Sequence, residues 1–168
     1  MATLFVKAMP LTKESFEPYG DVIETEGAKH FSINQGTVER YHDLATVEIG
    51  TNDDSRVLVS IAQCNQKSTI PHRITCLERH ILGSQAFIPM GDMQMVIAVA
   101  EPSDNLDITN IRAFVSNGKQ GINYKPGCWH MPAIFLDPEQ QMLIIDRGNS
   151  EMDCEEVFLH DEEIIIKY

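Results

Sequence analysis

Apolar residues in this sequence occur in short runs rich in β-branched side chains, with little that repeats at the spacing of a helix. Turn-forming residues separate the runs, which is typical of β-strands joined by tight connections. The predicted strands are Val57–Ala62, Gln85–Pro89, Met95–Ala100, Ile111–Val115, Met142–Ile145 and Ile164–Ile166. One short helix is predicted over Lys13–Glu17, where Thr12 can cap the first turn and Pro18 ends it. Many short strands without crossover helices favour an antiparallel sandwich or barrel.

Length and charge narrow the class of protein. With 168 residues the chain has the size of one domain, and we expect residues 1–168 to form a single unit. The formal net charge of -12 would repel a phosphate backbone, so we expect no nucleic-acid partner. The amino-terminal segment has no apolar run long enough for a signal peptide or a membrane span. Four cysteines without C-x-x-C spacing favour reduced thiols, and we expect a cytoplasmic protein without a membrane partner.

Two segments carry candidate chemistry. In the first, Glu78 and His80 are two residues apart and therefore share one face of a strand. Gln85 and Phe87 share a face in the next strand, beyond a Gly-Ser turn. In the second segment, a Pro-Gly turn delivers His130 to the start of a new strand. A carboxylate, an amide and two imidazoles can thus converge in the mouth of a barrel.

The spacing of these residues resembles the two motifs of the cupin superfamily. Glu78-x-His80-x4-Gln85 is similar to His-x-His-x4-Glu, with Glu in place of the first His and Gln in place of the Glu. Pro126-Gly127-x-x-His130 is similar to Pro-x-Gly-x-x-His. The resemblance implies an all-β, cupin-like double-stranded β-helix, which is a jelly-roll barrel, with one or two short helices and the site inside.

A second resemblance covers most of the chain. The segments Glu17–Glu24, Arg40–Ala45, Glu78–Pro89, Asn123–His130 and Asp146–Gly148 resemble the ureidoglycolate lyases of bacterial allantoin catabolism. That family implies a cytoplasmic homodimer that cleaves a small-molecule substrate, (S)-ureidoglycolate, into glyoxylate and urea. It also implies a divalent metal, nickel first with manganese or zinc as alternatives, and no organic cofactor. Two residues depart from the family pattern, since Met131 replaces a frequent second His and Ile81 replaces a usual Pro.

The candidate residues suit this reaction in two ways. One substrate carbon holds a hydroxyl, a carboxylate and the ureido nitrogen, so cleavage needs the hydroxyl deprotonated and the departing nitrogen protonated. A metal held by Glu78, His80, Gln85 and His130 would lower the hydroxyl pKa as a Lewis acid. Without a metal, Glu78 or one of the two histidines is the general base. The sequence leaves both routes open, with Glu78, His80 and His130 as catalytic candidates in each.

The remaining candidates have structural alternatives. Tyr124 either donates the proton to the ureido nitrogen or packs in the core. Arg40 and His42 either bind the substrate, with Arg40 as a fork on its carboxylate, or form a polar cluster at a dimer contact. Gln85 and Phe87 complete the predicted substrate-binding set, although an aromatic ring more often fills a barrel.

Three charged residues near these motifs are expected to have other roles. Alternation along the strand turns Arg79 away from the site and toward an outer carboxylate. Asp146 and Arg147 are expected to pack or to form a dimer contact. A non-catalytic cupin that binds a small carboxylate or a sugar is the alternative to the lyase, and a cupin isomerase or dioxygenase is a weaker third.

Overall fold

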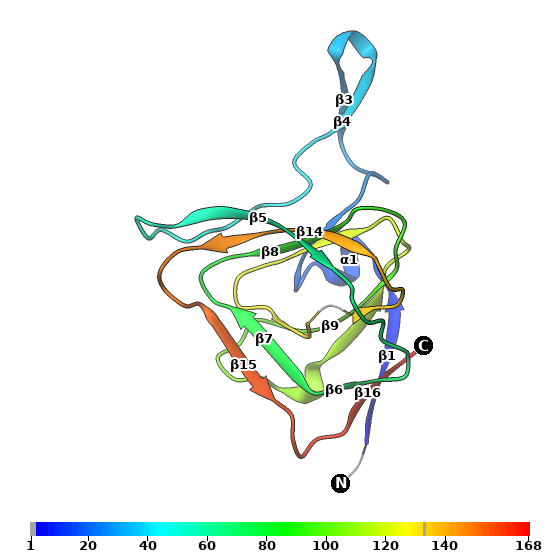
Figure 1. Ribbon diagram of the computed structural model, residues 1–168, viewed down its shortest axis with the longest axis vertical. Coiled ribbons are helices and arrows are strands. Elements are labelled where there is room, and N and C mark those ends of the chain that lie inside the picture. The colour runs from blue at the N-terminus through cyan, green and yellow to red at the C-terminus, as the bar shows by residue number, and fades with distance from the viewer. Residues whose placement is uncertain (1–2, 133) are drawn as a thin grey trace.

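Two sheets curl toward each other to form the body of the protein in a computed structural model that describes residues 3–132 and 134–168 (Figure 1). The larger sheet has the order β15 (Cys154–Phe158), β7 (Cys76–His80), β12 (Trp129–His130), β9 (Met95–Ala100), β10 (Arg112–Val115), β1 (Leu4–Pro10), β16 (Ile164–Lys167) and β6 (His72–Ile74), with β13 (Ile134–Phe135) pairing with β9. The smaller sheet has the order β2 (Gly20–Ile23), β11 (Gly121–Tyr124), β8 (Gln85–Pro89), β14 (Gln141–Gly148) and β5 (Arg56–Gln63). The predicted all-β, cupin-like double-stranded β-helix is confirmed.

All six predicted strands are present, and β8 and β9 have the predicted bounds. The predicted helix is α1 (Lys13–Phe16), and its cap is confirmed because the Thr12 hydroxyl accepts a hydrogen bond from the Ser15 amide at 3.1 Å. Two 3-10 turns complete the helical structure, η1 (Asn34–Gly36) and η2 (Ile108–Asn110). Over the described residues, no helix is long and apolar enough to cross a membrane.

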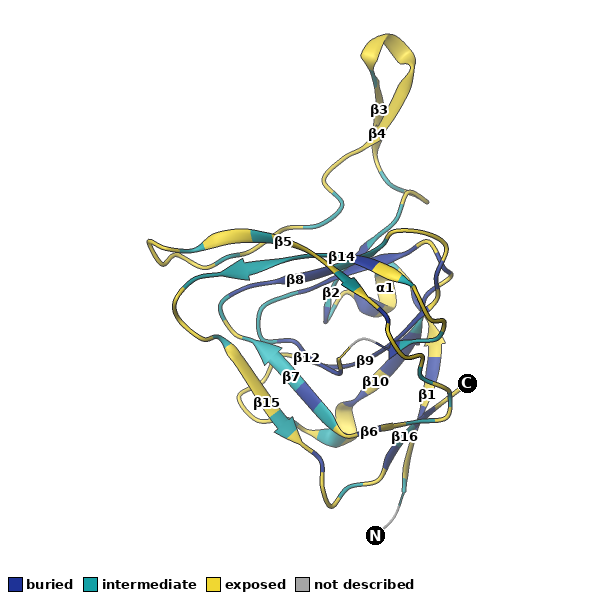
Figure 2. Ribbon diagram, viewed as in Figure 1, coloured by how far each residue is buried: buried dark blue, intermediate teal, exposed yellow. Residues whose placement is uncertain are grey.

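Strand β9 divides two apolar cores, because it is buried on both faces (Figure 2). Its residues Val96, Ala98 and Ala100 pack in one core with β1, β16 and Leu77 of β7. Its residues Met95, Ile97 and Val99 pack in the other core, which also contains residues of β11 and β14 and therefore lies between the sheets. Since Leu77 belongs to the first core, strand alternation turns Glu78 toward the space between the sheets.

A hairpin formed by β3 (His30–Ile33) and β4 (Val38–Tyr41) projects from the body, and we call it the arm (Figure 1). Its two strands pair with each other and with no other strand of the described chain. Apolar side chains on the arm are exposed, among them Phe31, Val38 and Tyr41. An isolated two-stranded hairpin is only marginally stable in water, so the arm lacks the packing that would normally support it.

Candidate active site

Three predicted metal ligands converge on the inner face of the larger sheet. His130 on β12 lies directly opposite Glu78 on β7 in antiparallel register, and directly opposed residues project from the same face. His80 follows two residues later on β7 and shares that face. One ligand atom from each of Glu78, His80 and His130 lies within 4.8 Å of the other two. We call these three residues the triad.

A backbone carbonyl determines that Nδ1 of His130 carries a proton. Nδ1 lies 3.0 Å from the carbonyl oxygen of Cys128, and because a carbonyl only accepts, Nδ1 carries the proton. In the neutral ring Nε2 carries the lone pair; it is buried without a hydrogen-bond partner and lies 3.4 Å from Oε1 of Glu78. A lone pair and a carboxylate oxygen at this distance repel each other unless a cation binds both.

His80 repeats this arrangement. Its Nδ1 lies 3.6 Å from Oδ1 of Asp153, while its Nε2 is buried without a hydrogen-bond partner. Metal-binding histidines commonly bond the second ring nitrogen to a carbonyl or a carboxylate, as His130 does here. Asp153 lies on the corresponding side of His80, at 3.6 Å, which is beyond hydrogen-bond distance. Two unpartnered imidazole nitrogens beside a carboxylate are a donor set for a borderline divalent ion. The residues present therefore fit a metal.

Gln85, the fourth predicted ligand, lies on the opposite sheet. On β8 it is in register with Tyr124 on one side and Asp146 on the other, so the three share a face. Its Nε2 donates to Oδ2 of Asp146 at 3.3 Å, and its Oε1 is buried without a partner. The amide oxygen is thus free to accept a hydrogen bond or to bind a metal, and which of these it does stays a prediction.

Tyr124 connects the two sheets at the triad. Its ring stacks on His130 with a centroid separation of 4.2 Å and an interplanar angle of 13°, and Phe87 meets it edge-on at 5.9 Å. Burial raises the pKa of Tyr124 well above the usual value of a phenol, so its hydroxyl keeps the proton and can donate it. The protonated form of the His130 ring donates a hydrogen bond to Glu78 and so lowers the pKa of that carboxyl, although partial burial works against it.

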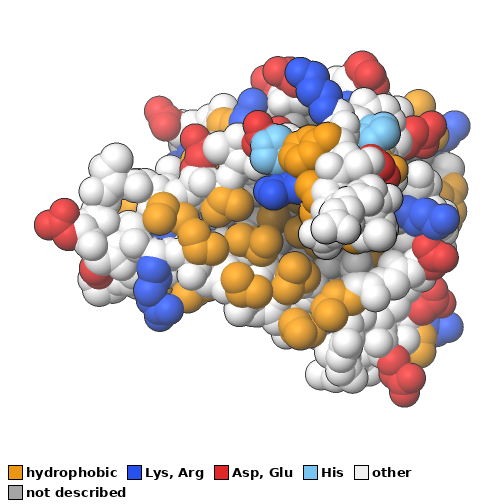
Figure 3. All heavy atoms as spheres, turned by 90° about the horizontal axis from the view of Figure 1, so that it is seen from above, with side chains coloured by type: hydrophobic (Ala, Val, Ile, Leu, Met, Phe, Trp, Pro, Cys, Tyr) orange, Lys and Arg blue, Asp and Glu red, His pale blue; other side chains and the backbone are white. Residues whose placement is uncertain are grey.

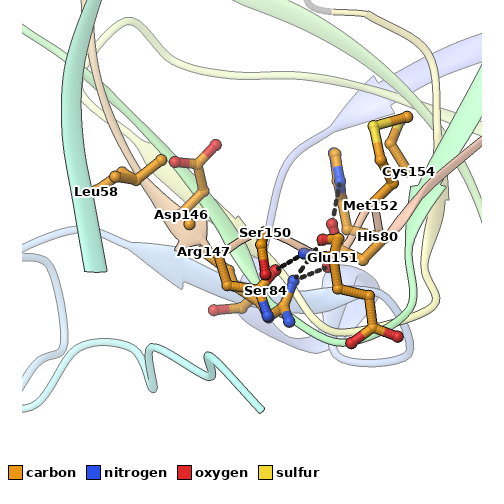
Figure 4. Close-up of a pocket in the computed structure, with 13 residues that line it drawn as sticks. Leu58, His80, Ser84, Asp146, Arg147, Ser150, Glu151, Met152 and Cys154 are labelled. Atoms are coloured by element: carbon orange, nitrogen blue, oxygen red, sulfur yellow. Dashed lines mark hydrogen bonds and ion pairs between the residues drawn. The ribbon is translucent and has the colours of Figure 1, made fainter. Parts of the chain in front are cut away.

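A cavity of about 330 Å³ is lined by His80, one residue of the triad (Figure 4). His80, Asp146, Arg147 and Cys154 are among its lining residues. Burial and, after it, the charge of Glu78 raise the pKa of the Cys154 thiol to about 11, so the thiol is neutral at physiological pH. The cavity is of a size that admits a small molecule.

The structure does not bring Arg40 and His42 to the triad of the same chain. Arg40 is an exposed residue of the arm, and His42 follows it and lines a separate hollow with Asp21 and Lys29. Arg79, in contrast, lies where alternation predicts. It forms an ion pair with Glu155 at 2.6 Å and covers the Trp129 ring at 4.7 Å, on the outer side of β7.

Three residues of this region have contacts that the sequence interpretation missed. Asp146 holds Gln85, and alternation from the buried Met142 could have revealed its inward direction. Arg147 and Asp153 form a contact of 3.7 Å between Nη1 and Oδ2. Because Asp153 lies in the turn between two strands, no periodicity indicates its direction.

Nearly the whole chain matches a known protein family. The family model described as ureidoglycolate lyase matches residues 3–167. A protein named ureidoglycolate lyase from Pseudomonas fluorescens (strain Pf0-1) is 44% identical over 166 residues, covering 99% of this chain and 97% of its own length. A protein of the same name from Pseudomonas paraeruginosa is 44% identical over 161 residues, covering 96% of this chain and 94% of its own length.

One solved structure with a related outline is a dTDP sugar isomerase from Desulfovibrio desulfuricans G20. It is 12% identical to this chain, with a TM-score of 0.45, and the match covers 86% of this chain and 88% of that one.

The triad predicts a metal site that a single substitution removes. We expect the purified protein to bind one Ni²⁺ per chain in equilibrium dialysis, and His130→Ala to weaken binding at least about 100-fold, because it removes a buried ligand. His160→Ala, which removes an exposed histidine outside the triad, should bind as the wild type does. Unchanged binding by a folded His130→Ala protein would place the metal elsewhere.

Proposed function

The chain belongs to the ureidoglycolate lyase family, and we propose that it cleaves (S)-ureidoglycolate into glyoxylate and urea between its two sheets. The observation that carries this proposal is the match to the family over nearly the whole chain. The triad supports placing the reaction beside Glu78, His80 and His130, where unpartnered polar atoms gather next to a cavity.

The reaction needs one proton to move from oxygen to nitrogen. The hydroxyl loses its proton, its C–O bond becomes the carbonyl of glyoxylate, and the C–N bond breaks with its electron pair on the ureido nitrogen. That nitrogen takes a proton and leaves in urea. No electron donor or acceptor takes part, so a site with one base, one acid and a means of holding the carboxylate is sufficient.

We assign the triad to the hydroxyl end of the substrate. Glu78, His80 and His130 would hold a divalent ion, which we propose to be nickel, through one carboxylate oxygen and the two unpartnered Nε2 atoms. When bound, the ion supplies Lewis acidity that lowers the pKa of the hydroxyl. The lowered pKa of Glu78 keeps its carboxylate ionised at neutral pH, so it can bind the ion or accept the hydroxyl proton.

The opposite sheet would hold the ureido end. Oε1 of Gln85 has no partner and can accept an N–H of the urea group, while Nε2 stays on Asp146. Phe87 supplies an apolar wall against Tyr124. Tyr124 remains protonated because of its burial, and stacking on His130 holds it beside the triad, so we assign it as the donor to the departing nitrogen.

A product assay tests the reaction itself. Purified protein incubated with racemic ureidoglycolate should release urea and glyoxylate in equal amounts and stop when one enantiomer is consumed. Binding of glyoxylate without turnover would instead indicate the non-catalytic cupin. If neither product forms, with or without added nickel or manganese, the lyase proposal fails.

The role of Tyr124 can be tested by removing one atom. Tyr124→Phe keeps the stack on His130 but removes the proposed proton donor, so we expect kcat to fall by about 10²-fold or more. Tyr19→Phe is the matched control, since Tyr19 is buried in the same core and contacts Phe16 instead of His130. Steady-state measurement of glyoxylate formation compares the two, and a wild-type kcat in Tyr124→Phe would exclude the assignment.

We also propose that the enzyme is a homodimer formed through the arm and β5. Strand β5 is an edge of the smaller sheet, and Val57, Val59 and Ile61 project exposed from one side of it. Figure 3 shows apolar side chains gathered on this face of the molecule. Arg40 lies on the arm, so its predicted contact with the substrate carboxylate, and that of His42, would be made in the pocket of the partner.

A charge placed on this apolar surface should separate the dimer. Val59 is 68% exposed, and Val59→Glu would put a carboxylate in the proposed contact. We therefore expect this variant to sediment as a monomer in sedimentation velocity. Met90→Glu adds the same charge at another exposed apolar residue, 54% exposed, and should leave the dimer intact. A wild type that sediments as a monomer would contradict the proposal directly.

We place the enzyme in the cytoplasm. All four cysteines, Cys64, Cys76, Cys128 and Cys154, are within the described ranges and are free. Free thiols are kept reduced in that compartment, which supports the proposal.

A further inference from the structure

Asp153 lies between His80 and Arg147 and is close to both. Asp153 is close to His80 through one oxygen, Oδ1 at 3.6 Å from Nδ1, and to Arg147 through the other, Oδ2 at 3.7 Å from Nη1. Asp153 is 12% exposed and Arg147 is 3% exposed in their side chains. The proposed reaction uses neither residue, yet burying an ion pair is costly unless it is well organised.

Arg147 is held from several sides. Its Nε donates to the carbonyl of Ile49 at 3.0 Å, and its Nη1 donates to the carbonyl of Glu151 at 3.4 Å. The backbone at Gly83 passes so near that a Cβ there would lie 2.6 Å from the Cβ of Arg147. The guanidinium is therefore fixed by backbone groups that do not depend on the triad, and its charge lies 3.7 Å from Oδ2 of Asp153, an oxygen that has no hydrogen-bond partner.

We propose that Asp153 is a positioning residue that fixes the proton of His80 on Nδ1 and turns Nε2 toward the metal, and that Arg147 holds Asp153 in place. A carboxylate only accepts, so it selects the imidazole form that has its proton on the nearer nitrogen. The carbonyl oxygen of Cys128 likewise selects the form of His130 that has its proton on Nδ1. The inference rests on the proposed metal site but not on the reaction.

The position of Asp153 agrees with support rather than ligation. It lies on the Nδ1 side of His80, whereas Nε2, which is buried without a hydrogen-bond partner, is the atom that we assign to the metal. The next residue, Cys154, is directly opposite His80 in the register of β15 with β7, so the start of β15 fixes where Asp153 sits. Asp153 and Arg147 both line the cavity beside His80.

The proton on His80 can be observed directly in the metal-free protein by ¹⁵N NMR of the imidazoles, with His80→Gln assigning the signal. In the wild type we expect the proton on Nδ1. In Asp153→Asn, whose amide can donate to Nδ1, we expect a shift toward the form with the proton on Nε2. His130 should not change, and the affinity for Ni²⁺ should fall by about 10- to 100-fold.

Glu155→Gln is the matched control, because it neutralises a carboxylate two residues away that pairs with Arg79 on the outer side. It should leave both the His80 signal and the Ni²⁺ affinity unchanged. Should Asp153→Asn fail to fold, Arg147→Lys keeps the charge but loses the fork, and we expect smaller changes in the same direction.

The proposal requires that both the ¹⁵N signal of His80 and the affinity for Ni²⁺ change in Asp153→Asn. An unchanged His80 signal, or an unchanged Ni²⁺ affinity, in the folded variant would overturn it. Neither measurement uses the substrate, so absence of lyase activity would overturn the proposed reaction and leave this inference to be judged separately.

Discussion

The antiparallel register of β12 against β7 is the constraint on which the site depends. It sets His130 opposite Glu78, and the period of two along β7 adds His80 to the same face. A slip by one residue would turn the imidazole of His130 into the other apolar core and bring Trp129 to the triad. The neighbouring pairing of His130 with Val99 on β9, a strand buried on both faces, makes that slip costly.

This arrangement gives the site several electron-pair donors that have no hydrogen-bond partner. Two imidazole nitrogens and the amide oxygen of Gln85 are buried without hydrogen-bond partners, and the carboxylate of Glu78 lies beside the two histidines. In a chain with a net charge of -12, attraction of an anionic substrate must come from local positive charge. A bound cation and an arginine supplied by the arm of a second copy would meet that need, while Arg147 is already engaged with Asp153.

Much of this was accessible from sequence because strands impose alternation. The inward faces of Glu78 and His80 and the outward face of Arg79 follow from position alone. Alternation does not say which sheet a strand joins, so the placement of Gln85 opposite the triad required the fold. It also says nothing about a turn, which is why Asp153 was missed. Nor does it reveal a hairpin that leaves the body, so the sequence left Arg40 open between a substrate contact and a dimer contact.

The two histidines of the triad differ in the group that faces Nδ1, and therefore in whether a substitution can remove that group. The partner of His130 is a main-chain carbonyl at Cys128, which every amino acid possesses, so substitution at that position leaves the acceptor in place. The partner of His80 is a side chain, and a single codon change removes it. In the proposed metal site, substitution at Cys128 would therefore leave the support of one ligand intact, whereas substitution at Asp153 would change the surroundings of the other while both ligands remain.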